Sequence, residues 1–232
     1  MPDYRIRYSK KGAAKYISHL DLLRTFERAG RRARLPLAFT KGFNPHPKIS
    51  FAAPLSVGIA GEQEFADIEL LEFISVEDLR RNLSLALPEG LEVLEARILN
   101  EVTSSLMAKV DRAVYRAEGE VSHRLNQERI EEVIGSFLDS SELWVERQGK
   151  KGAIRRQNIR EGIFSMTGSM QDHLLVLEME LKAGSSGNVR CEDVLESFCY
   201  TGAIPLKGRF TLSRLGLYGK PGVNIKENKL LW

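Results

Sequence analysis

The sequence predicts an α+β protein made of tandem ferredoxin-like domains, each with the order βαββαβ and an antiparallel sheet. Stretches that alternate apolar and polar residues, which are typical of strands, are separated by capped amphipathic stretches that are typical of helices. Their order in the first hundred residues is βαββαβ, and the same order returns in the second half. A length of 232 residues is enough for two ordinary domains.

The first expected domain covers residues 1–100. Strands or extended stretches are expected at 3–8, 37–58, 64–71 and 91–99, and turns at 9–12 and 59–62. A helix is expected over 18–34, with Ser18 as N-cap and Asp21 three residues later, and a second helix runs from Ser75 to about Leu87 with Asp78 in the same role. The apolar face of the first helix carries Leu22, Phe26, Ala29 and Ala33.

The second expected domain covers residues 109–232, after a boundary in the polar stretch 100–108. Its strands are expected at 109–121, 142–148, 173–182 and 209–218, and its helices at 126–138 and 189–199. Residues 149–172 are interpreted as a long hairpin or insertion, and 219–232 as a C-terminal extension. This second copy has no clear residue-level repeat of the first.

The composition is that of a globular protein of the cytoplasm. Hydrophobic residues make up 43% of the chain, and no apolar run approaches the roughly 20 residues of a membrane helix. The N-terminus lacks the apolar segment of a signal peptide. Cys191 and Cys199 are too few for a disulfide framework and fit no zinc spacing, so we interpret both as reduced structural thiols.

The charge is unevenly distributed along the chain. The net charge is +3 overall, but residues 1–48 carry +9 and residues 49–100 carry −7. A basic surface of this kind attracts phosphate-rich partners. On the first helix, the basic face would consist of Arg24, Arg28 and Arg31, which we predict to bind nucleic acid. The alternative is an ordinary solvated helix face.

The loop that follows the first helix is the most unusual local sequence. Gly42 permits a positive φ, and Pro45 and Pro47 restrict the backbone on either side of His46. Phe43 lies between Lys41 and Lys48, and an aromatic ring with flanking cations can stack on a base. We predict that these three residues bind nucleic acid. The alternative places Phe43 in the core, with the loop as a rigid connection.

A second basic segment lies in the expected hairpin. Residues 147–160 carry six positive charges and no acid. A glycine-hinged basic hairpin is a plausible nucleic-acid arm, and the residues predicted to bind there are Lys150, Lys151, Arg155 and Arg156. The alternatives are an acidic protein partner or a solvated loop.

The two histidines of the N-terminal stretch are the candidates for catalysis. His19 is expected at the positive end of the first helix, and His46 is held between two prolines. Together they could act as base and acid on an RNA 2′-hydroxyl, whereas the alternative gives each a structural role. A metal site from His19, Asp21 and His46 has only generic spacing. We find no phosphate-binding glycine loop, no dinucleotide fingerprint and no cysteine triplet for an iron–sulfur cluster, so no metal or cofactor is expected.

Four segments of the first domain carry a family resemblance: 16–22 (YISHLDL), 32–36 (RARLP), 42–51 (GFNPHPKISF) and 54–58 (PLSVG). They resemble the radical-SAM-linked protein family, a family of uncharacterised bacterial proteins, and the match is specific across about residues 4–72. Members occur alone or as a C-terminal extension of B12-binding radical SAM proteins. The resemblance implies a radical SAM partner and no settled activity. The basic stretch around Arg155 departs from the family pattern.

Three functions remain open at this point. The first is a non-catalytic accessory module of a radical SAM enzyme that binds RNA or presents substrate through its basic surface. The second is a metal-independent endoribonuclease with His19 and His46, since the duplicated βαββαβ order is also similar to the tandem ferredoxin-like RNA endonucleases of CRISPR systems. The third is a protein-interaction scaffold. The basic first helix, the Phe43 loop, the absence of a cofactor motif and the family resemblance together favour the first.

Overall fold

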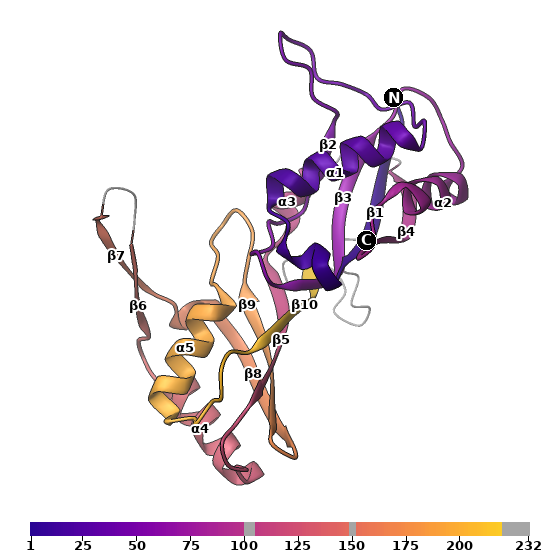
Figure 1. Cartoon of the computed structure of the whole chain (residues 1–232). Coiled ribbons are helices and arrows are strands. Elements are labelled where there is room, and N and C mark those ends of the chain that lie inside the picture. Colours follow the sequence, from indigo (N-terminus) through magenta and orange to yellow (C-terminus); the bar gives the residue numbers. More distant parts are fainter. Residues whose placement is uncertain (100–104, 149–151, 220–232) are drawn as a thin grey trace. The chain divides into compact units, whose positions relative to one another are not determined.

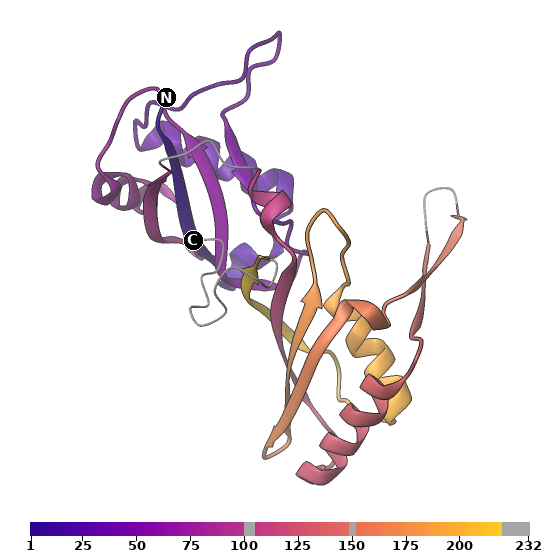
Figure 2. The ribbon, with the colours of Figure 1, turned by 180° about the vertical axis from the view of Figure 1, so that it is seen from behind.

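The computed structural model describes residues 1–99, 105–148 and 152–219. In these ranges, helices are combined with mostly antiparallel strands, which confirms the α+β class (Figures 1 and 2). The chain divides into two compact units. The first takes its described residues from Met1–Asp111 and from Arg214 onward, and the second is Arg112–Ser213. None of the described helices is both long enough and apolar enough to cross a membrane.

The first unit is built on an antiparallel sheet. Its elements are β1 (Asp3–Lys10), η1 (Gly12–Tyr16), α1 (His19–Arg32), β2 (Ile49–Phe51), β3 (Ala60–Glu69), α2 (Val76–Ala86), β4 (Leu91–Leu99) and the short α3 (Leu106–Lys109). The strand order is β4-β1-β3, and β2 pairs with β3 through Phe51 opposite Ala66. The last strand, β10 (Thr211–Tyr218), follows β3 in the order and begins in the second unit.

Helices α1 and α2 cover one face of this sheet (Figures 1 and 2). Since side chains alternate along a strand, Tyr4, Ile6 and Tyr8 of β1 all enter the same core, where they are buried. The helices contribute residues at helical spacing, among them Leu22 and Phe26. Arg5 and Arg7 therefore lie on the opposite face of the sheet, where Arg5 forms a two-bond ion pair with Asp67.

Both predicted helix caps are confirmed. The Ser18 hydroxyl accepts a hydrogen bond from the Asp21 backbone N–H at 3.2 Å and donates to the Asp21 carboxylate at 2.7 Å. Ser75 and Asp78 repeat this arrangement at the start of α2. A short polar side chain at the N-cap satisfies a backbone donor that has no partner within the helix. These two serines therefore set where the helices begin.

In the second unit, antiparallel strands pair in the order β5-β9-β8. Its elements are β5 (Arg112–Glu120), α4 (Gln127–Asp139), β6 (Trp144–Gln148), β7 (Ile154–Asn158), η3 (Arg160–Gly162), β8 (Ile163–Gln171), β9 (Leu174–Lys182) and α5 (Cys191–Gly202). Phe137 of α4 and Phe198 of α5 meet edge to face with ring centroids 5.5 Å apart. Strands β6 and β7 form a separate two-stranded hairpin.

The interpretation of residues 142–172 is wrong in one respect. The segment expected as a sheet strand, 142–148, becomes β6 and pairs only with β7, whereas the sheet strand β8 comes from the stretch interpreted as an insertion. Strand β8 lacks an apolar signal because Ser165, Thr167 and Ser169 are exposed. Its inner face carries Gly168, where a Cβ would lie 2.8 Å from side-chain atoms of Ile130 and Leu177. Glycine thus lets α4 pack closely on the strand.

Two predicted turns are also wrong. Ser9 and Lys10 continue β1, opposite Glu92 and Leu91 of β4, and β3 begins at Ala60. These residues are polar or small, so the sequence suggests turns, but their backbones pair as strands. Lys10, for example, is fully buried. Turn composition misled here because a lysine inside a strand is uncommon.

The division into units departs from the expected domains at the C-terminal end. Residues 100–104, within the predicted boundary, and residues 220–232 of the predicted extension lie outside the described ranges. Arg214 and the strand residues after it group with the first unit. The reason is visible at Arg214, which pairs with Glu64 of β3.

Candidate nucleic-acid interface

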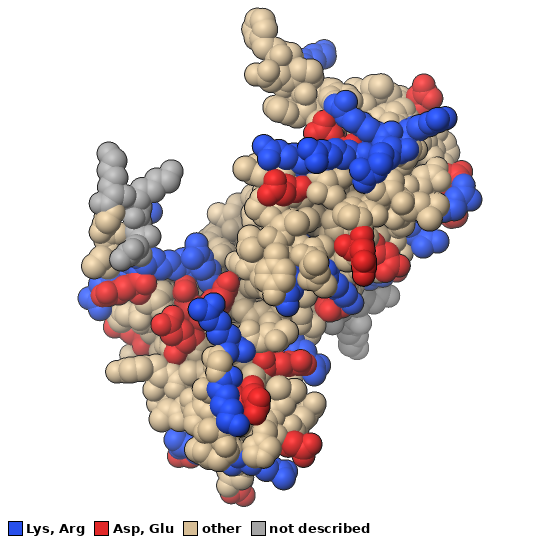
Figure 3. Space-filling model, viewed as in Figure 1, with Lys and Arg blue, Asp and Glu red and all other residues tan. Residues whose placement is uncertain are grey.

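The exposed face of α1 carries the three arginines that the sequence predicts. Arg24, Arg28 and Arg31 are all exposed, while Leu22 and Phe26 on the opposite face are buried. Lysine and arginine side chains gather over this helix in Figure 3. Arg24 pairs with Asp21 at 3.3 Å and Arg31 pairs with Glu27 at 2.8 Å. Such exposed pairs are weak, so the guanidinium groups remain available to an anion.

The loop between α1 and β2 projects from the first unit (Figures 1 and 2). Its base is closed by hydrogen bonds from the Thr40 N–H to the His46 carbonyl at 2.8 Å and from the His46 N–H to the Thr40 hydroxyl at 3.0 Å. Phe43 near its tip is fully exposed, at 106% of the reference area. The alternative that placed Phe43 in the core is therefore wrong, and the ring is available for stacking.

The loop and the basic helix face form one surface. The Arg31 guanidinium lies 5.6 Å from the ring centroid of Phe39, which precedes Thr40 at the base of the loop. Lys41 is exposed on the loop. Lys48 is half-buried, and its ammonium donates to both carboxylate oxygens of Glu69 at 2.8 Å. We name this surface the α1 face and define it as Arg24, Arg28, Arg31, Lys41 and Phe43.

His19 and His46 lie in different surroundings. His19 is the first residue of α1, and its ring meets the edge of Phe51 at 5.5 Å between centroids. His46 is exposed on the projecting loop. Asp21, the third member of the generic metal set, is engaged by Ser18 and Arg24. No group of three or more histidines, cysteines or carboxylates that could hold a metal was found within the described residues.

The basic hairpin is only partly described. Arg155 and Arg156 are exposed on β7, whereas Lys150 and Lys151 lie outside the described residues. Arg156 pairs with Glu146 at 3.3 Å. On β6, one residue before the end of the strand, Arg147 donates to the Asp193 carboxylate of α5, with Nε at 2.8 Å. Its arginines therefore differ in role, because Arg147 anchors the hairpin and Arg155 faces solvent.

A buried polar cluster that the sequence did not reveal holds the segments next to α1 in place. Arg214 donates to the Glu64 carboxylate. It also donates to the Ala53 carbonyl at 2.9 Å and to the Pro54 carbonyl at 3.2 Å. The Lys10 ammonium donates to the Ile17 carbonyl at 2.9 Å, immediately before the N-cap of α1. Burial lowers the pKa of Lys10, an effect that nearby Glu64 opposes. In a sequence, a buried charged residue of a strand cannot be told apart from an exposed one. Arg214 could have been identified as buried only if its partner Glu64 were already known.

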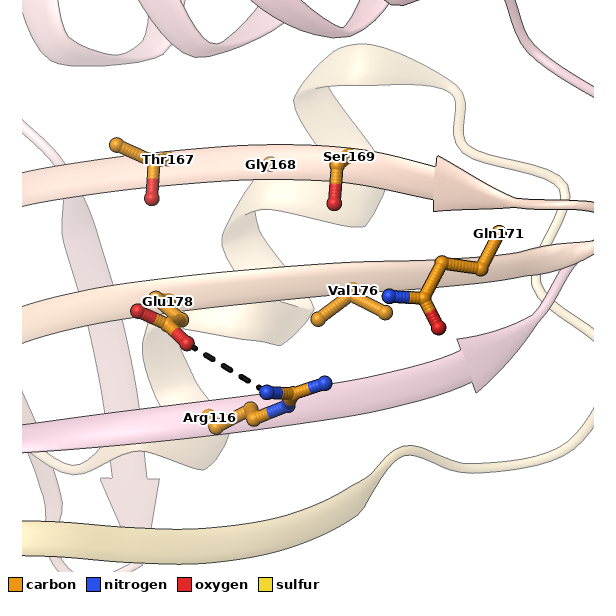
Figure 4. A pocket seen from close by; sticks show the side chains of 7 residues that line it. All are labelled: Arg116, Thr167, Gly168, Ser169, Gln171, Val176 and Glu178. Atoms are coloured by element: carbon orange, nitrogen blue, oxygen red, sulfur yellow. Dashed lines mark ion pairs between the residues drawn. The ribbon is translucent and has the colours of Figure 1, made fainter.

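A shallow polar depression of about 310 Å³ lies on the face of the second unit's sheet that α4 leaves uncovered (Figure 4). Arg116, Glu178 and Thr167 are directly opposite one another on β5, β9 and β8, so they share that face. Arg116 also pairs with Glu118 at 2.8 Å. The two negative charges of Glu118 and Glu178 outweigh the positive charge of Arg116, so this depression disfavours binding of a phosphate backbone.

The two cysteines are unsuited to nucleophilic catalysis. Burial raises the pKa of Cys199 to about 11, and burial together with Glu192 raises the pKa of Cys191 well above its ordinary value. A catalytic thiol needs a lowered pKa and a positive environment. Both thiols are free, as the sequence predicts for structural cysteines.

Thiol labelling will test this assignment of the cysteines. At pH 8, a pKa of about 11 leaves Cys199 with about 100-fold less thiolate than a free cysteine, and its higher intrinsic nucleophilicity recovers about tenfold. Cys199 should therefore react with a disulfide reagent about tenfold more slowly than free cysteine, and Cys191 should react only after unfolding. In urea, both should react at the free rate. Fast labelling of Cys191 in the folded protein would contradict the assignment.

The fold and the α1 face define a two-unit α+β protein with a basic, aromatic-bearing surface on its first unit. The chain belongs to a family of uncharacterised proteins conserved in bacteria (DUF2344), whose model matches residues 3–191. No curated protein shows a significant match to the sequence.

Solved structures give likenesses of fold. A chain of a Cbf5-Nop10-Gar1 complex aligns with a TM-score of 0.51 and 10% identity, over 94% of this chain and 50% of that one. A chain of an archaeal box H/ACA sRNP Nop10-Cbf5 complex aligns with a TM-score of 0.48 and 10% identity, over 91% of this chain and 46% of that one. The protein thus spans about half the length of these two chains. At such identity the likeness concerns the fold alone.

Proposed function

We propose that this protein is a non-catalytic module that binds RNA, or presents a substrate, through the α1 face and works with a radical SAM enzyme. The observation that carries the proposal is Phe43, a fully exposed aromatic ring on a loop closed at its base, beside a helix face with three exposed arginines. Aromatic rings stack on unpaired bases and arginines bind the backbone, which is the common pattern of single-strand recognition.

The partner enzyme rests on the resemblance of residues 4–72 to the radical-SAM-linked family. We also propose that both units are ferredoxin-like, in tandem. The first unit supports this with the element order β1, α1, β2, β3, α2, β4 and the pairing of β1 with both β3 and β4. In the second half of the chain, the order β5, α4, β8, β9, α5, β10 is the same once the β6–β7 hairpin is set aside.

The nuclease alternative has less support. It needs His19 and His46 at one phosphodiester, whereas His19 contacts Phe51 and His46 lies on the projecting loop. It predicts cleavage of small structured RNAs in EDTA with a cyclic phosphate product, which should disappear when both imidazoles are removed. The scaffold alternative predicts equal retention on heparin and on an acidic protein column, without preference for RNA.

A purification from native lysate tests the proposal as a whole. The tagged chain is crosslinked to RNA in the cell and recovered, and both RNA and protein partners are identified. We expect crosslinked RNA and a radical SAM enzyme. If neither RNA nor a radical SAM enzyme is recovered, the proposal is wrong.

The contribution of the α1 face is tested by its arginines. In the triple variant Arg24→Gln, Arg28→Gln and Arg31→Gln, the dependence of log K on log salt for single-stranded RNA should flatten by about 0.7 for each phosphate that the protein no longer neutralises. Stability should change little, because the ion pairs with Asp21 and Glu27 are exposed and contribute about 0.3–0.5 kcal/mol each.

A matched control removes the same kind of charge elsewhere on the first unit. Arg80 and Arg81 are exposed on α2, and the double variant Arg80→Gln, Arg81→Gln should keep both affinity and salt slope. If the α1 variant melts normally and its slope is unchanged, α1 does not take part in binding.

A further inference from the structure

The β6–β7 hairpin is a rigidly held arm. Arg147 is fixed to Asp193 of α5. At the base of the hairpin, the Asn158 carboxamide oxygen accepts from the backbone N–H of Leu143 at 3.0 Å and of Arg160 at 3.1 Å. Arg160 in turn donates through Nε to the Leu138 carbonyl at the end of α4, at 2.7 Å. The arm is therefore positioned before any ligand arrives, which lowers the entropic cost of binding.

The two faces of the hairpin have different surroundings. Glu146 is directly opposite Arg156, and Arg147 is directly opposite Arg155. Because side chains alternate along each strand, Trp144, Glu146, Ile154 and Arg156 share one face, and Arg147 and Arg155 share the other. Arg147 is bound to α5, so the Trp144 face is the outward one. Ile154 and Trp144 are 66% and 51% exposed there.

Trp144 has a defined orientation on this outward face. Its indole N–H donates to the Glu142 carboxylate at 2.8 Å, and the Arg156 guanidinium lies 5.3 Å from its ring centroid. About half of the side chain nevertheless stays exposed. A single exposed apolar residue needs no explanation, but this ring is fixed by two partners and stands on an anchored arm, next to the basic segment 147–160.

We infer that Trp144 is a stacking platform for a base of single-stranded RNA, as a second contact of the proposed RNA-binding function on which this inference rests. Arg156 contributes by stacking, because its guanidinium already lies against the Trp144 ring. Arg155 lies on the other face of the hairpin, beside Arg147, and takes no part in this stack. An acidic protein surface fits less well, because Glu142 and Glu146 flank the ring.

Stacking and charge neutralisation differ in their dependence on salt. Removal of a cation that neutralises a phosphate flattens the slope of log K against log salt, whereas removal of a ring that stacks on a base lowers affinity at every salt concentration equally. Trp144→Ala should therefore weaken binding by about 5- to 150-fold with an unchanged slope. The α1 triple variant should instead flatten the slope. The two surfaces are thus separable in one set of titrations.

The experiment uses the full chain with Trp232→Phe, which leaves Trp144 as the single tryptophan. Titration with a ten-nucleotide oligoadenylate should quench its fluorescence, since a stacked base quenches indole emission. Trp144→Phe in the unmodified chain should retain most of the affinity, because it keeps an aromatic face. The control is Tyr200→Ala, which removes an aromatic side chain that is 89% exposed on α5 and should leave binding unchanged.

Each outcome decides the inference. If RNA binds but neither quenches Trp144 nor loses affinity in Trp144→Ala, the inference is wrong and the proposed function stands on the α1 face. A flattened slope in Trp144→Ala would show an electrostatic role and overturn stacking. If no RNA binds to the unmodified chain at all, the inference is wrong, and the RNA-binding form of the proposed function is wrong with it. Should Trp144→Ala fail to fold, a fall in affinity for Arg156→Gln at unchanged slope supports the platform, and unchanged affinity overturns it.

Discussion

Replacement of Arg214 with methionine should lower the free energy of unfolding of the first unit by about 3–5 kcal/mol, the usual cost of breaking a buried ion pair on one side. Arg214 and Glu64 have only 2% and 3% of their side chains exposed. Arg214→Met leaves the Glu64 carboxylate buried beside two carbonyls, of Ala53 and Pro54, that no longer have this donor. Urea unfolding with and without the substitution measures the difference.

Two further variants separate the ion pair from the volume of the side chain. Arg214→Met combined with Glu64→Leu removes the unpaired charge and should recover most of the stability, because apolar replacements of buried ion pairs are often neutral. Arg209→Met is the matched control, since Arg209 is exposed just before β10, and it should change stability by less than about 0.5 kcal/mol. An Arg214→Met protein as stable as the parent would show that Lys10 or water replaces the missing donor.

The same cluster links the scaffold to the α1 face. Arg214 holds the chain at Ala53 and Pro54, and Lys10 holds the Ile17 carbonyl ahead of the helix. Burial, with the charge of Glu64, raises the pKa of Tyr8 well above its ordinary value. Tyr8 therefore stays neutral over the physiological range and adds no second negative charge beside Glu64. The charge partner of Glu64 is Arg214.

Local interactions explain what could be predicted from the sequence. Ser18 and Ser75 were identifiable as caps because their partners, Asp21 and Asp78, lie three residues away. The basic and apolar faces of α1 follow from the 3.6-residue period. Such signals lie within one stretch of sequence, so no knowledge of the fold is needed to interpret them.

The features that escaped prediction depend on distant residues. Arg214 and Glu64 are separated by 150 positions, and either one alone looks like a surface residue. Strand β8 presents serine and threonine on the uncovered face of its sheet, so its alternation is not apolar. Phe43 remained open between core and solvent because a loop with glycine and proline can direct a ring either way. Only the packing of the whole unit decides these cases.

Two phenylalanines of the first unit provide the final prediction, since they have the same chemistry and opposite exposure. Phe26 is 1% exposed under α1 and meets Tyr8 and Phe51 edge to face, with ring centroids 5.1 Å and 5.4 Å away. Phe26→Ala should lower the free energy of unfolding by about 3–5 kcal/mol, because it leaves a cavity and breaks two aromatic contacts.

Phe43→Ala is the matched control in the same measurement. Its ring makes no ring contact among the described residues and is fully exposed, so stability should stay within about 0.5 kcal/mol. Affinity for single-stranded RNA should nevertheless fall by about 5- to 150-fold, the effect of removing one base–aromatic stack. If Phe43→Ala destabilises the protein as much as Phe26→Ala, the loop packs in solution and the α1 face loses its aromatic residue. If Phe43→Ala is stable and binds RNA as before, the arginines of α1 bind the backbone without a stacked base at the loop.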